Sequence, residues 1–205
     1  MIISVWQQFI EGLQHTTWLE FIAVIAGIGS VWFSKKENIL VYPVGLINTI
    51  IYIFLSLKGN LFGEASVNLY YSIMSIYGWI MWARRNPEHH HVLQISYSNR
   101  REWMHQLLFF LVFYLIIFVA LSWLKKAFAP EAIPWADALA SASAYTGMWL
   151  MTRKKIENWY WWIITNIASI PLYFSKGYVF TSFQFMVLLV LAIAGLLSWQ
   201  KKIQR

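Results

Sequence analysis

The chain has 205 residues, of which 59% are hydrophobic and only 12% are charged, and its formal net charge is +7 at pH 7. Soluble domains carry roughly 25% charged residues, so this composition excludes an ordinary soluble protein and requires lipid to cover part of the apolar surface. There is no cysteine, which excludes disulfides, thiol catalysis and cysteine-based metal sites. Because excess Lys and Arg marks the cytoplasmic loops of membrane proteins, the positive charge does not indicate nucleic-acid binding.

The N-terminal segment, residues 1–17, places apolar side chains at roughly helical spacing among polar ones. This pattern predicts a short amphipathic helix that lies on the membrane surface or packs over a pore mouth. After it come segments that approach the ~20 mostly apolar residues of a membrane-spanning helix. There are seven of them: 18–33, 39–57, 61–83, 103–124, 135–151, 159–175 and 179–199.

The chain also contains an internal repeat. Trp18 and Trp135 open similar apolar runs 117 residues apart, and Gly78 and Gly195 each begin a Gly-x-x-x-Trp motif. Such self-similarity in an apolar chain indicates a duplicated membrane bundle, which usually carries a solute. We expect an amphipathic N-terminal segment (1–17), a first three-helix repeat (18–83), a cytoplasmic loop, linker membrane helix and external loop (84–134), a second three-helix repeat (135–199) and a cytoplasmic tail (200–205).

The loops predict the orientation. Seven spans put four Lys on the N-terminal side and twelve Lys and Arg on the other side, so the C-terminus is expected in the cytoplasm and the N-terminus outside. Three crossings reverse the chain, and the span at 103–124 returns it, so both repeats begin outside. The predicted fold class is therefore an all-α integral membrane protein with seven transmembrane helices. They form a 3+1+3 arrangement of two parallel triple-helix repeats related by an axis along the membrane normal.

Polar side chains inside spans are costly, which makes them candidate binding residues. Asn48 and Asn166 lie in the second span of each repeat, and a primary amide can pair with a solute without burying charge. Trp162 precedes Asn166 by one helical turn, and a ring beside an amide suits a flat, cationic heteroaromatic solute. For both asparagines the alternative role is hydrogen bonding between helices. For Trp159, at the end of the same span, anchoring at the membrane interface is the favoured alternative.

A polar stripe follows the third span, where Glu64, Asn68 and Tyr71 share one helix face. Gln184 lies at the matching depth of the seventh span. These residues predict the lining of a wet cavity, although Glu64 lies near the outer end, where simple solvation is the alternative. The histidines at 89–91 invite a metal site, but their polar setting favours a solvated loop. We predict no metal, no cofactor and no enzymatic activity, and the remaining alternative to a carrier is a channel or a structural membrane protein.

Four sequence blocks carry a family resemblance. They are Trp-x-Glu at 18–20, Gly-Leu-Ile-Asn at 45–48, Ile-Tyr-Gly-Trp-Ile-Met-Trp at 76–82 and Arg-Lys-Lys-x-Glu-Asn-Trp-x-x-Trp at 153–162. Together they resemble the Pnu-type (PnuC-like) bacterial vitamin transporters, over about residues 18–202. The resemblance implies a fold like that of the SWEET sugar transporters, in the bacterial cytoplasmic (inner) membrane, and a homo-oligomer, expected as a trimer.

The resemblance also implies facilitated diffusion of an unphosphorylated B-type vitamin, which a cytoplasmic kinase then traps. Nicotinamide riboside is the first candidate, bound between the repeats near Trp162, Asn166, Asn48 and a polar residue of the third span. The chain departs from the pattern at that last residue, because Asn68 stands where nicotinamide riboside carriers usually have Gln. Thiamine and riboflavin, which relatives of the same fold carry, are therefore the alternatives.

Overall fold

The computed structural model describes residues 5–58, 62–85, 92–125 and 133–204, and these residues form a bundle of helices. The helices are α1 (Val5–His15), α2 (Trp18–Lys35), α3 (Val41–Lys58), α4 (Phe62–Ala83), α5 (Arg100–Leu124), α6 (Pro134–Thr152), α7 (Asn158–Ser175) and α8 (Val179–Ile203). The bounds of α2 to α8 agree with the seven predicted segments to within four residues, and α1 occupies the segment predicted to be amphipathic.

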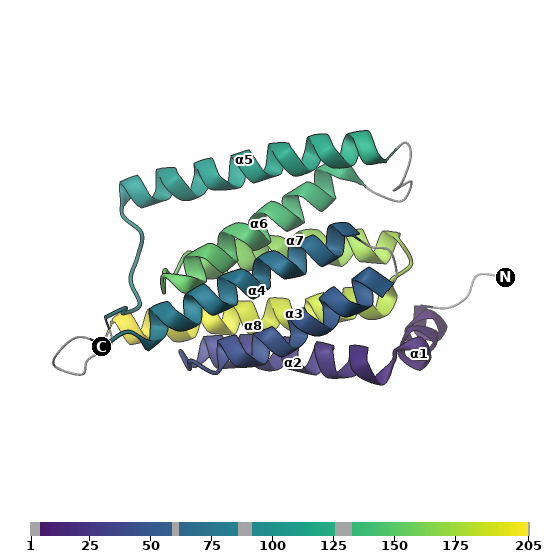
Figure 1. The fold of residues 1–205 in the computed structure, drawn as a ribbon, viewed down its shortest axis with the longest axis horizontal. Coiled ribbons are helices and arrows are strands. Elements are labelled where there is room, and N and C mark those ends of the chain that lie inside the picture. The colour runs from purple at the N-terminus through teal and green to yellow at the C-terminus, as the bar shows by residue number, and fades with distance from the viewer. Residues whose placement is uncertain (1–4, 59–61, 86–91, 126–132, 205) are drawn as a thin grey trace.

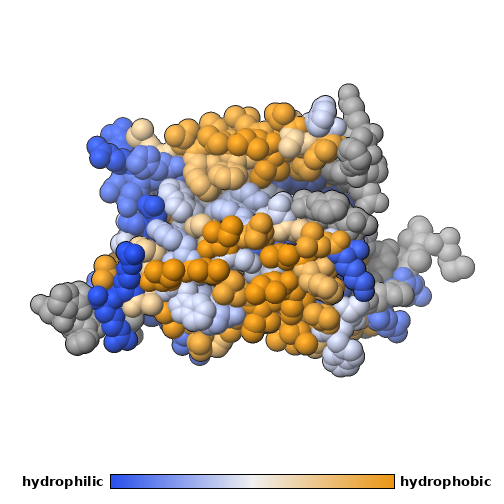
Figure 2. Space-filling model, in the orientation of Figure 1, coloured by the Kyte–Doolittle hydropathy of each residue, from blue (hydrophilic) through white to orange (hydrophobic). Residues whose placement is uncertain are grey.

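The bundle has an apolar middle and hydrophilic ends. Figure 2 shows a hydrophobic band across the bundle, with hydrophilic residues gathered at both ends. By length and composition, four of the described helices can cross a membrane: α2, α3, α5 and α8. The helices α4, α6 and α7 are less apolar because they carry polar side chains that the bundle buries, including Asn68 of α4, Thr146 of α6 and Asn166 of α7.

The linker helix α5 lies along one edge of the bundle, against α6 (Figure 1). Most of its apolar side chains are exposed, as expected for a helix that faces lipid. One polar group breaks this pattern: Gln106 is fully buried, and its Oε1 accepts a hydrogen bond of 2.9 Å from Nε1 of Trp161. The preceding loop is attached to the second repeat as well, because Ser98 donates two hydrogen bonds of 2.8 Å to the Glu157 carboxylate. Helix α5 and the loop before it are thus attached to the second repeat.

The duplication is visible in the helix bounds and in the packing. α3 and α7 begin and end 117 residues apart, which is also the spacing of α4 and α8 at their first residues. α3 packs against α2 and α4, and α7 packs against α6 and α8. The two triplets meet where α2 contacts α8 and where α4 contacts α6. The first helix of each triplet thus contacts the third helix of the other, which is the pattern of a two-fold axis along the bundle.

The repeated Gly-x-x-x-Trp motif has a packing role. A Cβ atom on Gly78 of α4 would collide with the buried Tyr42 ring of α3, and one on Gly195 of α8 would collide with the Trp159 ring of α7. The tryptophan that ends each motif meets the same ring edge-on, at centroid distances of 5.2 and 5.4 Å. Each glycine therefore lets an aromatic ring approach the helix backbone, and the tryptophan completes the contact. With 1% of its surface exposed, Trp159 is a core residue, so its favoured interpretation as an interface anchor was wrong.

Candidate functional site

An aromatic cluster joins the two repeats in the middle of the bundle. The ring of Trp162, on α7, lies over Gly147 of α6, where a Cβ atom would be 3.2 Å from the indole. Tyr71 of α4, from the other repeat, contacts two rings. Its centroid lies 6.3 Å from that of Trp162 and 6.1 Å from that of Tyr145 on α6. The structure thus brings Trp162 and Tyr71, two of the predicted site residues, into contact across the boundary between the repeats.

The cluster also includes Tyr70 and Tyr145, which are not among the predicted site residues. Tyr70 donates a hydrogen bond of 3.1 Å to the backbone carbonyl of Tyr145, and the two rings are 4.4 Å apart. This contact connects α4 to α6. A signal for Tyr145 was present in the sequence, because it is the one large side chain in a run of small residues at 140–147. Helices rich in small residues pack closely, so a large residue within such a run must fill a defined space.

Asn166 is a buried residue one helical turn after Trp162, and its side-chain amide has no hydrogen-bond partner among the described residues. The amide atoms are not among the fully enclosed polar atoms that lack a partner, so they keep some accessible surface. An accessible amide without a protein partner can bond water or a ligand. Asn48 differs, because its Nδ2 donates a hydrogen bond of 2.7 Å to the carbonyl of Ala23 in α2. That bond is of the kind that holds helices together, which was the alternative role considered for Asn48.

The two asparagines are not equivalent in the structural repeat. The residue that corresponds to Asn48 at the 117-residue spacing is Thr165, whose Oγ1 donates to the carbonyl of Ala140, as Asn48 does to Ala23. The expected symmetric placement of Asn48 and Asn166 was therefore wrong by one residue. By the same spacing, the residue that corresponds to Trp162 is Gly45. The aromatic plate belongs to the second repeat alone, so the candidate site is asymmetric.

The remaining predicted residues lie on α4 and α8. Asn68 is buried, and its Nδ2 donates a hydrogen bond of 3.0 Å to the carbonyl of Glu64 in its own helix. The Glu64 side chain is exposed, as expected for a position near the end of the helix. Gln184 is half-buried on α8. Among the described residues no cluster of acidic or histidine side chains could hold a metal ion, and residues 89–91 lie outside them.

The aromatic rings of the candidate site are closed on one another. Centroid distances of 6.1 and 6.3 Å are ordinary contacts between rings and leave no room for another ring between them. A cavity of about 260 Å³ lies elsewhere, at the end of the bundle that carries the C-terminus, and is lined by Glu37, Gln94, Ile95, Lys202 and Ile203. A flat ligand at Trp162 therefore requires Tyr71 or Trp162 to move.

Comparison with known proteins adds to this geometry. The sequence profile of a family described as nicotinamide mononucleotide transporter matches residues 17–201. The nicotinamide riboside transporter PnuC of Escherichia coli (strain K12) is 25% identical over 203 residues, which cover 89% of this chain and 85% of that protein. The riboflavin/roseoflavin transporter RibM of Streptomyces davaonensis is 23% identical over 193 residues, which cover 94% and 89%. A crystal structure of the vitamin B3 transporter PnuC matches the fold with a TM-score of 0.71 at 23% identity, covering 98% of this chain and 88% of that one.

Proposed function

The chain belongs to the nicotinamide mononucleotide transporter family, and on that premise we propose that it carries an unphosphorylated B-type vitamin, nicotinamide riboside first, across the bacterial cytoplasmic membrane. The curated relatives named PnuC are nicotinamide riboside transporters, which supports this order of candidates. Riboflavin is the second candidate because RibM is similar over nearly the whole chain.

The proposed architecture has seven membrane spans, α2 to α8, in a 3+1+3 arrangement of parallel repeats. The packing supports it, because equivalent helices make equivalent contacts and α2 and α6 both end at the end of the bundle that holds the C-terminus. The excess of Lys and Arg at that end supports a cytoplasmic C-terminus and an external N-terminus. Self-association as a trimer stays a prediction from the family resemblance.

We place the substrate between the repeats, with its ring on Trp162 and its polar edge at Asn166. The observation that carries this proposal is the side-chain amide of the buried residue Asn166, which has no hydrogen-bond partner among the described residues and lies one helical turn from the Trp162 ring. Tyr71 covers that ring in this structure and must move to admit the substrate. Nicotinamide riboside has a cationic pyridinium ring, which is attracted to the face of an indole, and a carboxamide, which can exchange two hydrogen bonds with an asparagine amide. Riboflavin has a neutral ring system and gains only the stacking contribution.

We propose supporting roles for the remaining candidate residues. Tyr71 covers the other side of the ring, while Asn68 and Gln184 meet the sugar. Asn48 and Trp159 support the helices around the site, and Glu64 lies at the outer entrance. The two repeats rock around the bound vitamin and release it inside. Transport needs no ion gradient, because phosphorylation by a cytoplasmic kinase keeps the internal concentration of free vitamin low.

The test is uptake into vesicles that contain the purified protein and have no ion gradient. We expect saturable uptake of labelled nicotinamide riboside, and faster uptake when the vesicles are preloaded with unlabelled vitamin, because a carrier exchanges its substrate. Riboflavin and thiamine serve as competitors and rank the three candidates. Uptake that rises linearly with concentration would indicate a channel, and the absence of binding to any of the three vitamins in calorimetric titration would refute the substrate assignment.

A further inference from the structure

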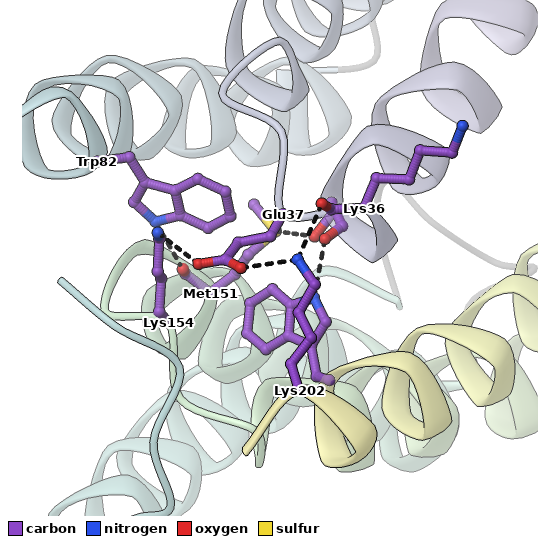
Figure 3. Close-up of polar contacts among 8 residues, drawn as sticks. Lys36, Glu37, Trp82, Met151, Lys154 and Lys202 are labelled. Carbon is purple, nitrogen blue, oxygen red and sulfur yellow. Dashed lines mark hydrogen bonds and ion pairs between the residues drawn. The ribbon is translucent and has the colours of Figure 1, made fainter. Parts of the chain in front are cut away.

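A second set of contacts between the two repeats lies at the end of the bundle that carries the C-terminus, and Figure 3 shows its polar contacts. The residues involved are Ser34, Glu37, Trp82, Met151, Lys154 and Trp199, which we call the basic-end cluster. They come from the ends of α2, α4, α6 and α8 and from the turns that follow α2 and α6. These are the four helices through which the repeats meet, so the basic-end cluster closes the bundle at this end.

Two tryptophans make equivalent hydrogen bonds across the boundary, each to a backbone carbonyl of the other repeat. Nε1 of Trp82, in the first repeat, donates to the carbonyl of Met151 at 3.2 Å. Nε1 of Trp199, in the second repeat, donates to the carbonyl of Ser34 at 3.0 Å. Ser34 and Met151 are themselves equivalent positions, 117 residues apart, and Oγ of Ser34 lies 3.4 Å from Sδ of Met151. The two indole rings are 6.2 Å apart, so the contacts lie close to the two-fold axis.

An ion pair spans the same boundary. Nζ of Lys154 lies 2.7 Å from Oε1 of Glu37, and these residues are also 117 positions apart. Both have positive φ angles, 52° and 59°, so each occupies the same left-handed turn after the first helix of its repeat. In an identical pair of repeats, such positions would carry like charges that repel. Here they carry opposite charges, so the duplicated positions have diverged into an attractive contact.

The surroundings strengthen this pair. Lys154 is buried, and its Nζ lies 4.7 Å from the centroid of the Trp82 ring. Nζ of Lys202, from the end of α8, lies 2.8 Å from the second carboxylate oxygen of Glu37 and donates to the backbone carbonyl of Lys36. Burial alone would raise the pKa of the Glu37 carboxyl, but its hydrogen bonds and charge contacts with Lys154 and Lys202 lower that pKa below 4.5. The carboxylate is therefore ionised at neutral pH.

We propose that the basic-end cluster is the cytoplasmic gate of the carrier, closed in this structure and opened by separation of Glu37 from Lys154 and of each tryptophan from its carbonyl. This inference rests on the proposed function, because it assigns an opening step to the same transport cycle. Repeats that rock around a central site must separate at the end where release occurs, and these contacts hold that end together. Each of them joins one repeat to the other, so rigid-body movement of the repeats breaks them as a set.

The first test uses cross-linking, for which the natural chain is suitable because it has no cysteine. In the double variant Ser34→Cys, Met151→Cys, a short thiol-specific cross-linker joins the repeats within the gate. We expect cross-linking to reduce nicotinamide riboside uptake to the level of empty vesicles, and cleavage of the link to restore it. The control is Glu102→Cys, Lys155→Cys, an ion pair of 2.9 Å at the same end that joins α5 to its own repeat. Full uptake by the cross-linked gate variant would overturn the proposal.

The second test needs no vitamin. A single Ser34→Cys variant places a thiol at a buried position inside the gate, and its alkylation by a membrane-impermeant maleimide from the cytoplasmic side measures opening. Adding Lys154→Met should raise the alkylation rate, whereas adding Lys155→Met should leave it unchanged. Equal rates in both backgrounds would refute the gate. If the rate rises as expected but no vitamin is taken up, the gate stands and the vitamin assignment fails.

Discussion

Replacing Gly78 by alanine should destabilise the protein, although alanine is the better helix former. The Cβ atom of alanine would overlap the ring of Tyr42, which is fully buried and held edge-on by Trp82, so the ring has no free space to enter. Overpacking of a rigid core costs about 1–3 kcal/mol. The gain from replacing glycine within a helix is about 0.5–1 kcal/mol, so the overlap decides the sign. We expect a net loss of about 1–2 kcal/mol.

Gly29 provides the matched control in α2. A Cβ atom there would lie 3.6 Å from Cγ1 of Val44, which is an ordinary van der Waals contact. Gly29→Ala should therefore stabilise the protein by about 0.5–1 kcal/mol through helix propensity alone. The assay is thermal unfolding in detergent, in which about 1 kcal/mol shifts the midpoint by roughly 2–4 °C for a chain of this size. The two variants should move the midpoint in opposite directions.

A second variant checks the cause. The hydroxyl of Tyr42 is buried without a hydrogen-bond partner among the described residues, so Tyr42→Phe should be neutral or slightly stabilising. It should not rescue Gly78→Ala, because ring carbons as well as the hydroxyl oxygen would overlap the new methyl group. Tyr42→Leu should recover part of the loss in the double variant. If Gly78→Ala raises the unfolding midpoint as Gly29→Ala does, the packing explanation of the repeated motif is refuted.

Three further predictions concern the site and the gate. Trp162→Ala should weaken vitamin binding by about 1–3 kcal/mol in calorimetric titration, and an unchanged affinity would remove this ring from the site. Asn48→Ala should leave that affinity unchanged and lower thermal stability by about 0.6 kcal/mol, the average for hydrogen bonds between membrane helices. Asn166→Ala should weaken vitamin binding and leave thermal stability unchanged. The Glu37 carboxyl has a lowered pKa, so its contribution to stability is present above pH 4.5 and is lost as the pH falls through the lowered value. The difference in unfolding midpoint between the natural protein and Glu37→Gln should thus stay constant from pH 8 to 5 and shrink at lower pH; a difference that is already lost at pH 6 would contradict the ion pair.

The helices could be predicted closely because each is a long apolar segment between charged turns, and that signal is local. The exact register of the repeat could not be predicted, because the two asparagines look equivalent in sequence. Packing decides that Asn48 bonds a backbone carbonyl of the neighbouring helix and that Asn166 does not. Thr165, a weaker polar residue, holds the place of Asn48. Similarly, Trp159 has the position of an interface anchor along the chain, but the glycine that receives its ring lies far away at Gly195.

Several residues of the candidate site could be selected from the sequence, but their contacts could not. Trp162, Asn166 and Tyr71 stand out as aromatic or amide groups within apolar spans, and the structure brings Trp162 and Tyr71 together. Tyr145 was missed because tyrosines are common in this chain and its contacts come from another repeat. The cross-repeat pairing of Glu37 with Lys154 was also beyond local pattern, since it depends on the axis between the repeats.

The opposite charges at positions 37 and 154 also mean that the two halves of this protein are not interchangeable. A carrier assembled from two identical copies of the first half would bring two glutamates face to face at its centre line, and two copies of the second half would bring two lysines together. In either symmetric chimaera, like charges would repel at the place where Glu37 and Lys154 attract each other in the natural chain. Each half of the chain therefore supplies the charge that the other half lacks at this contact.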